Sequence, residues 1–264
     1  QRGGYEHFML KEIHEQPKMV GEMVRQYDLA MKEEAEPFSL TGVDFNNILF
    51  LACGSSYYAS LVGKHIIEQL TRIPVQVTLA SEFNYSEPVL NKTLAIAVTQ
   101  SGETADTVKA LRKVKEKGFP TLAITNVLSS SITRLADQTF YTMAGPEISV
   151  AATKSFTTQL IALYLLSLSL NNIDNSFRRR FTDDLRKLSD GIDRVLLNEK
   201  QIAGFGKFMS RFQHAFFLGR GLNMPVALEG ALKMKEISYI PAEGLAAGEL
   251  KHAPIALLGP DMQL

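Results

Sequence analysis

The stretch Asn-Ile-Leu-Phe-Leu-Ala-Cys-Gly-Ser-Ser, residues 47–56, decides the fold class of this chain. Its first part is a continuous apolar run, as expected of a strand that is buried on both faces of a sheet. Gly54, Ser55 and Ser56 then end the run, and residues 57–71 follow with helical periodicity. A buried strand that passes through a short loop into a helix is typical of a βαβ unit, so the stretch predicts a parallel sheet.

The same alternation of apolar strand and helix continues beyond this first unit. The helix predicted over 104–117 ends at Gly118, and Pro120 lies just beyond it, which is a normal helix stop. Further strands are predicted at 75–80, 94–98, 121–125 and 138–143. Because helices between parallel strands cover both faces of the sheet, we predict an α/β domain with a five-stranded parallel sheet flanked by helices.

The rest of the chain predicts helices on both sides of this domain and a second αβ unit. Residues 5–34 show a helical stripe that Pro17 interrupts, and the charged segment 32–37 is expected to be a mobile connector. Later helices are expected at 153–172, 179–197 and 199–211. A new strand at 215–219 opens the second unit, and 255–258 is a possible start of another strand. The expected organisation is an N-terminal helical linker at 1–40, a first domain at 41–198 and the start of a second, apparently truncated domain at 199–264.

Composition excludes several classes of protein. Lysine plus arginine equals aspartate plus glutamate, at 28 each, so nothing indicates a nucleic-acid or membrane surface. Cys53 is the single cysteine, which excludes a disulfide framework and suits a reducing cytoplasm. The five histidines lack metal-ligand spacing, so nothing indicates a metal site. No charged-then-apolar leader opens the chain, and no apolar run reaches the ~18 residues of a membrane span.

Three loops rich in small hydroxyl residues lie where ligands bind in an open parallel sheet, beyond the carboxyl ends of the strands. They are Gly54-Ser55-Ser56, Thr99-Gln100-Ser101-Gly102-Glu103-Thr104 and Ser149-Val150-Ala151-Ala152-Thr153-Lys154-Ser155. Each leads into a predicted helix, whose free N–H groups and partial positive charge favour an anion. Any one loop is explained as a set of helix N-caps, but three at one sheet edge favour a phosphate monoester site. The chain lacks the glycine motifs of P-loop and dinucleotide folds.

A second candidate site lies in residues 227–254. Glu229, Lys233 and Glu236 fall at i, i+4 and i+7, so they share one face of a predicted helix. That spacing alone also fits a solvated salt-bridge ladder. A polar loop beyond the helix then brings His252 into the same stretch, and an acid, a base and a histidine together suit proton-transfer chemistry.

Four other side chains in the sequence could be reactive. Cys53, at a strand end, is interpreted as a small apolar residue that closes the strand rather than as a nucleophile. His65 lies within a predicted helix and His214 precedes a strand, so both are interpreted as structural. Lys154 is left open between loop–helix packing and contact with a phosphate.

Several motifs together resemble a known family. They are Ala-Cys-Gly-Ser-Ser (52–56), Gln-Ser-Gly-Glu-Thr-Ala-Asp-Thr (100–107), Glu-Ile-Ser-Val-Ala-Ala-Thr-Lys-Ser-Phe-Thr (147–157) and Leu-Gly-Arg-Gly (218–221), followed by Ala-Leu-Glu-Gly-Ala-Leu-Lys-Met-Lys-Glu-Ile-Ser-Tyr-Ile (227–240) and Gly-Glu-Leu-Lys-His (248–252). The set resembles the sugar-isomerase (SIS) half of the glutamine–fructose-6-phosphate aminotransferases (isomerizing), the glucosamine-6-phosphate synthases. Residues 5–17 resemble the segment that joins the glutaminase half of those enzymes to the isomerase half.

The resemblance implies tandem SIS domains of flavodoxin-like, three-layer αβα architecture in a cytoplasmic homodimer. It implies fructose 6-phosphate as the ligand, with no metal and no cofactor, in a pathway that makes amino sugars. The phosphate would be held by Ser56, Ser101 and Thr104, with Thr99 and Gln100 close by. The other implied contacts to the sugar phosphate are Gly54, Ser55, Val150 and Ala152.

For catalysis, the resemblance implies that Glu236 moves a proton between C1 and C2 of the sugar, supported by Lys233 and Glu229. His252 would open the sugar ring, on the site of the neighbouring subunit. The two neighbouring charges on the helix would set the acidity of Glu236.

Three departures from the family pattern limit these expectations. The glutaminase half is not in the sequence, so the chain is not expected to hydrolyse glutamine. Ala152 stands where the family often has serine, so one sugar contact is expected to be backbone only. The sequence stops at Leu264, before the family's tail lysine that forms a Schiff base with the ketose. We therefore expect the chain to bind the sugar phosphate but to turn it over poorly.

Two alternatives remain open from the sequence. One is a stand-alone SIS deaminase that releases ammonia from glucosamine 6-phosphate, which needs the same pocket. The other is a non-catalytic SIS module that senses phosphosugars, for which the phosphate loops alone would suffice.

Overall fold

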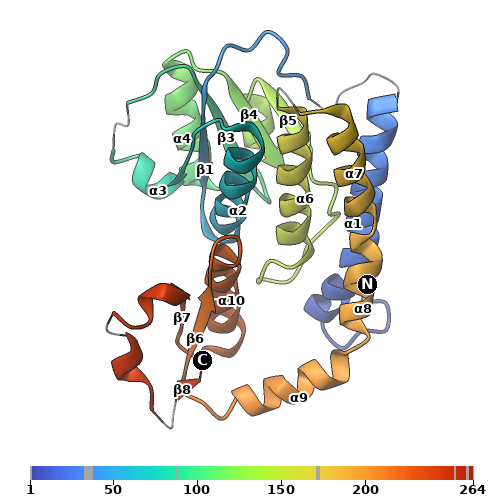
Figure 1. The fold of residues 1–264 in the computed structure, drawn as a ribbon, viewed down its shortest axis with the longest axis vertical. Coiled ribbons are helices and arrows are strands. Elements are labelled where there is room, and N and C mark those ends of the chain that lie inside the picture. The colour runs from blue at the N-terminus through green and yellow to red at the C-terminus, as the bar shows by residue number, and fades with distance from the viewer. Residues whose placement is uncertain are drawn as a thin grey trace.

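A five-stranded parallel sheet lies at the centre of the larger part of the molecule (Figure 1). The computed structural model describes residues 2–32, 38–86, 89–170, 173–252, 254–259 and 262–263. The strands are β1 (Asn47–Ala52), β2 (Val75–Leu79), β3 (Thr93–Thr99), β4 (Thr121–Thr125) and β5 (Gln138–Tyr141), in the order β2-β1-β3-β4-β5. All neighbouring strands in this sheet are parallel, which confirms the sheet predicted from the sequence.

Alternate residues of the central strands supply two separate apolar cores, one on each face. Ile48 and Phe50 pack with α2 (Gly54–Thr71) and α6 (Lys154–Ser169). Leu49 and Leu51 face the opposite way. They pack with the shorter helices α3 (Ala80–Phe83), α4 (Ala105–Glu116) and α5 (Ser131–Leu135). This arrangement explains why β1 and β3 are apolar throughout, because each of these strands is covered on both faces.

The N-terminal helix α1 (Phe8–Lys32) forms an additional outer layer against α6 (Figure 1). The sequence predicted that Pro17 interrupts this helix, but α1 continues through it. Proline cannot donate to the carbonyl four residues earlier, and the side-chain amide of Gln16 donates to that Ile13 carbonyl instead, at 3.1 Å. The predicted connector over 32–37 falls mainly on residues 33–37, which lie outside the described residues.

Two helices lie where the sequence predicted a single one at 179–197. They are α7 (Asn175–Arg186) and α8 (Leu188–Leu196), and both pack against α1. The side chain of Asp174 caps α7 by accepting from the backbone N–H groups of Ser176 and Phe177, so α7 begins before the predicted start.

A second, smaller parallel sheet follows α9 (Glu199–Met209) (Figure 1). Its elements are β6 (His214–Gly219), α10 (Asn223–Ser238), β7 (Ala242–Ala246), the 3₁₀ helices Ala247–Glu249 and Pro254–Leu257, and β8 (Met262–Gln263), in the strand order β7-β6-β8. The strand proposed from the sequence at 255–258 is wrong, because most of that segment is 3₁₀ helix. The sequence also missed β7, whose Glu243 and Gly244 are poor strand formers.

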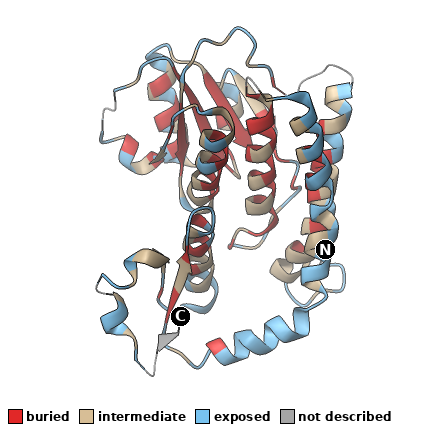
Figure 2. Cartoon of the chain, viewed as in Figure 1, coloured by how far each residue is buried: buried red, intermediate tan, exposed pale blue. Residues whose placement is uncertain are grey.

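Burial is concentrated in the larger sheet and in the helices that face it (Figure 2). By contrast α9 is exposed over most of its length, and Phe205 on it is 58% exposed. None of the helices in the described ranges is both long and apolar enough to cross a membrane.

Candidate active site

A cavity of about 240 Å³ lies at the carboxyl ends of β1 and β3, where the connections that leave the sheet diverge to its two faces. This is the topological switch point of an open parallel sheet, the usual place for a ligand. The lining residues are Cys53, Ser55, Ser56, Val98, Thr99, Gln100, Ser101, Thr104, Thr107, Glu147, Ser149, Val150, Ala152, Ser155 and Gln159. The three hydroxyl-rich loops of the sequence therefore meet around one hollow.

The first loop connects β1 to α2. Gly54 has a positive φ of 56°, which allows the chain to turn directly from the strand into the helix. Ser56 is buried, and its hydroxyl accepts a hydrogen bond of 2.9 Å from the side-chain amide of Gln159 on α6. Ser55 points toward α10, because its hydroxyl donates to Glu229 Oε1 at 2.8 Å. The two adjacent serines thus connect the cavity to two different helices.

The second loop, between β3 and α4, is held by its own hydroxyl groups. The hydroxyls of Thr99 and Thr104 lie 3.1 Å apart, and the N–H of Gly102 donates to Thr99 Oγ1 at 3.3 Å. Ser101 Oγ accepts from the N–H of Glu103 at 3.1 Å. The loop is therefore ordered, with four of its residues already facing the cavity.

The third loop differs from the other two because a carboxylate of the chain already caps the helix behind it. Glu147 Oε1 accepts from the N–H groups of Thr153 and Ser155, at 2.9 and 3.2 Å, and from the hydroxyl of Thr153. Since these amides at the start of α6 already have an acceptor, the third loop forms a wall of the cavity. Val150, on that wall, is 98% exposed.

The candidate acid–base helix α10 is joined to this cavity through Ser55. Lys233 Nζ lies 3.2 Å from Glu229 Oε1, 2.6 Å from Glu236 Oε2 and 3.2 Å from Ser55 Oγ. The sequence prediction that these three charged residues share one helix face is confirmed. The arrangement is more than a solvated ladder, because Glu229 is only 5% exposed and bonds a cavity residue.

Burial sets the acidity of two groups beside this helix. It raises the pKa of Glu229 above its usual range, although the positive charge of Lys233 and the hydrogen bond from Ser55 act in the opposite direction. Burial and the nearby Glu229 carboxylate raise the pKa of Tyr58.

His252 is the candidate that the structure leaves apart from the cavity. It is exposed in a turn after the first 3₁₀ helix, where its backbone N–H donates to the carbonyl of Glu249. Glu236 does not line the cavity either. Lys233 nevertheless connects Glu236 to Ser55, and Ser55 does line the cavity.

The remaining candidates fall in three kinds of place. Cys53 is half-buried in the cavity lining, and Thr107 Oγ1 lies 4.0 Å from its sulfur. His65 and His214 are both exposed. Lys154 is buried and paired with Glu15 on α1 at 2.6 Å, so packing between loop and helix explains it.

Several residues around the cavity were not singled out from the sequence. Glu147, Thr107 and Gln159 line it, and Glu12 supports it from α1. Gln159 was detectable as a polar residue in the apolar run of α6. Glu12 left no signal, because its contacts are with residues 136 and 137 positions away.

The fold and the site define a class of protein. A family model described as "SIS domain" matches residues 43–169 and 209–264, and the chain belongs to this family.

Comparison with individual proteins narrows the similarity to one kind of enzyme within this family. The chain is 49% identical to a protein of Methanosarcina acetivorans and 46% identical to one of Aquifex aeolicus. Both are named glutamine--fructose-6-phosphate aminotransferase [isomerizing], and the matches cover 98% and 99% of this chain but 43% of each relative. The chain thus spans less than half the length of these curated relatives. A solved structure described as the C-terminal domain of glucosamine-fructose-6-phosphate aminotransferase from Francisella tularensis is 39% identical, with a TM-score of 0.91 over 99% of this chain and 76% of that one.

Proposed function

We propose that this chain is the isomerase half of a glutamine–fructose-6-phosphate aminotransferase, and that it binds fructose 6-phosphate and converts it, with ammonia, to glucosamine 6-phosphate. One observation carries the proposal. Ser55 joins a hydroxyl-lined cavity to an acid–base network on α10 that is anchored by the buried Glu229, in a chain whose relatives carry that enzyme name. The larger sheet is proposed as the first domain and residues 199–264 as part of the second.

The phosphate group is proposed to bind between the first two loops. Ser56, Ser101 and Thr104 offer hydroxyl donors there, and the starts of α2 and α4 offer backbone N–H groups and a partial positive charge. Thr99 and Gln100 complete this side of the cavity. Gly54, Ser55, Val150 and Ala152 are proposed to contact the remainder of the molecule.

The sugar carbons are proposed to lie toward α10. Ammonia condenses with the C2 carbonyl with loss of water to form an imine. A proton must then leave C1 and one must reach C2, while the C1 hydroxyl loses its proton and the imine nitrogen gains one, which gives an aldehyde at C1 and an amine at C2. The carboxylate of Glu236 is proposed to take the proton from C1 and to deliver one to C2. Lys233 Nζ, 2.6 Å from Glu236 Oε2, orients that carboxylate, while the buried Glu229 holds Lys233 and Ser55 in place.

Two protein partners are proposed, a second subunit and a glutaminase domain. The exposed His252 lies apart from the cavity of its own chain, which supports a role at the cavity of a neighbouring subunit in a homodimer. A glutaminase domain in the whole enzyme is proposed as the ammonia source. The single cysteine supports a cytoplasmic location.

The test is a Glu236→Gln variant, compared with Glu243→Gln, which changes an exposed glutamate on β7. Fructose 6-phosphate binding is measured by calorimetry. Conversion to glucose 6-phosphate or, with ammonia, to glucosamine 6-phosphate is measured by a coupled assay in a chain extended to the full length of the relatives. We expect Glu236→Gln to bind normally and to lose at least about 100-fold in turnover, since general acid–base catalysis contributes roughly 10²–10⁴-fold. Glu243→Gln should retain both properties.

Other outcomes identify the alternatives. Release of ammonia from glucosamine 6-phosphate, without the synthetic reaction, would indicate a deaminase. Binding without turnover, in this chain and in one extended to the full length of its relatives, would indicate a sensor and contradict the proposed enzyme.

A further inference from the structure

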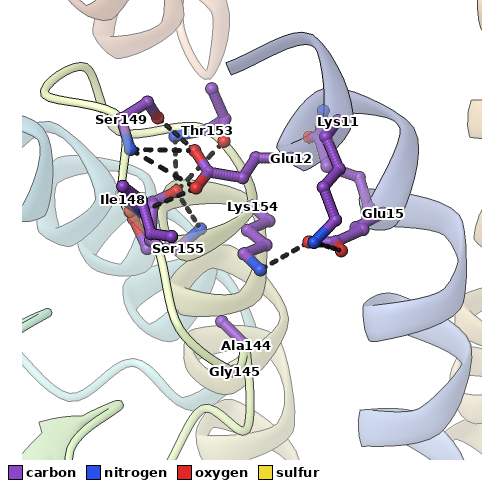
Figure 3. A network of polar contacts seen from close by, with 12 residues as sticks. Lys11, Glu12, Glu15, Ala144, Gly145, Ile148, Ser149, Thr153, Lys154 and Ser155 are labelled. Carbon is purple, nitrogen blue, oxygen red and sulfur yellow. Dashed lines mark hydrogen bonds and ion pairs between the residues drawn. The ribbon is translucent and has the colours of Figure 1, made fainter. Parts of the chain in front are cut away.

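A buried carboxylate that the proposed reaction does not use lies on the second turn of α1. Glu12 is 2% exposed, and its side chain points from α1 into the loop that precedes α6 (Figure 3). It accepts from the N–H of Ile148 at 2.6 Å, from the N–H of Ser149 at 3.3 Å to each oxygen, and from the hydroxyl of Ser149. These donors all belong to the loop that forms one wall of the cavity.

Residues 142–153, which include this wall, contain neither helix nor strand, so the loop depends on side chains for its shape. Asn126 fixes its beginning by accepting from the N–H of Ala144 and donating to the carbonyl of Gly145. Glu147 fixes its end by capping α6. Glu12 supplies the acceptors for the middle, at the position next to Val150.

The same face of α1 contacts the first turn of α6 (Figure 3). Glu15 Oε2 lies 2.6 Å from the buried Lys154 Nζ, and Gln16 Oε1 accepts from the hydroxyl of Thr157 at 2.5 Å. Burial would raise the pKa of Glu15, but Lys154 and Lys11 outweigh it and lower that pKa. The loop and the start of α6 are therefore attached to α1 as one unit.

We infer that Glu12 is a positioning residue for sugar-phosphate binding, and that α1 and the cavity are thermodynamically coupled through it. This inference rests on the proposed function for the identity of the ligand. Glu12 keeps Ser149, Val150 and Ala152 in the wall, so a ligand that needs this wall binds best when α1 is docked. By linkage, the bound ligand stabilises the docked helix by the same factor.

The experiment compares the chain with Glu12→Ala, Glu12→Gln and Tyr27→Phe. Tyr27 is a matched control, because it is also buried on α1 but its hydroxyl lies 3.3 Å from Ser169 Oγ, at the far end of α6. Amide hydrogen exchange of residues 144–153 is measured without ligand, and the Kd of fructose 6-phosphate is measured separately, with inorganic phosphate as a second probe.

In Glu12→Ala we expect exchange of the Ile148 and Ser149 amides to accelerate at least tenfold and the Kd of fructose 6-phosphate to rise about tenfold or more. Glu12→Gln, which keeps one acceptor oxygen, should lie between this variant and the wild type. Tyr27→Phe should change neither quantity. Fructose 6-phosphate should also slow exchange in residues 9–16 of the wild type and not in Glu12→Ala.

The exchange and binding measurements fail in different ways. Unchanged exchange at Ile148 and Ser149 in Glu12→Ala overturns the inference whether or not a ligand binds. An equal loss of affinity in Glu12→Ala and Tyr27→Phe also overturns it, because the effect would then be general loosening of α1. Failure of the wild type to bind fructose 6-phosphate refutes the proposed function, while the ligand-free exchange still decides whether Glu12 holds the loop.

Discussion

Gly102 lies at the tightest point of the second cavity loop, and replacing it with alanine should damage both stability and binding. Its φ is +69°, where an L-residue costs roughly 1–2 kcal/mol. A Cβ at this position would lie 2.1 Å from Ser130 Oγ and 2.6 Å from Ser130 Cβ. Neither Gly102 nor Ser130 can move away easily, because the Gly102 carbonyl accepts from the N–H of Ile132 at 3.0 Å and Ser130 is only 3% exposed. Overpacking of this kind costs about 1–3 kcal/mol, so Gly102→Ala should lose about 2–5 kcal/mol in total.

Gly118→Ala provides the matched control. Gly118 has a φ of +82° at the end of α4, but no atom lies within 4 Å of the point that an alanine Cβ would occupy there. It should therefore lose only the backbone cost of roughly 1–2 kcal/mol. Urea unfolding followed by circular dichroism gives both free energies, and binding of fructose 6-phosphate should weaken in Gly102→Ala alone. Equal destabilisation of the two variants, or normal binding by Gly102→Ala, would refute the claim that this loop cannot adjust.

Two further predictions concern pH. Because the pKa of Glu229 is raised, this residue stabilises the fold below its unfolded pKa, near 4.5, and that contribution is lost as the pH rises through the folded value. Urea unfolding between pH 4 and 8 should therefore show a loss of stability in the wild type that Glu229→Gln lacks. Parallel profiles of the two proteins would contradict this prediction. Burial would raise the pKa of Asp137, but hydrogen bonds from Lys115 and Thr121 lower it. Asp137→Asn should therefore be less stable than the wild type at neutral pH, and the difference should shrink as the pH falls through the lowered value; a constant difference down to pH 2 would count against this cause.

The sequence by itself predicted the five strands of the larger sheet along the chain and the loops that surround the cavity, but it gave neither the order of those strands across the sheet nor the short helices α3 and α5. Apolar runs such as 47–52 and stop signals such as Gly118 act within a few residues, so they can be read without knowing the fold. The common edge reached by the three loops also followed, because the carboxyl ends of parallel strands lie on one side of a sheet. The resemblance added the identity of the candidate ligand.

Predictions from local sequence patterns were wrong where a group outside the pattern supplied the needed hydrogen bond or strand partner. Helix α1 continues through Pro17 because Gln16 occupies the free carbonyl, and β7 forms because β6 offers it a parallel partner. Neither the proline nor the Ala-Glu-Gly-Leu-Ala sequence of β7 indicates this outcome.

Only the tertiary structure decided how the parts of the site are connected. Ser55 and Glu229 are 174 residues apart, and Glu12 and Ile148 are 136 apart. Contacts over such separations leave no periodic signal, because one hydroxyl or carboxylate at a single position makes each of them. Sequence spacing put Glu229, Lys233 and Glu236 on one helix face, but burial in the tertiary structure is what raises the pKa of Glu229, and the hydrogen bond from Ser55 is what joins that face to the cavity.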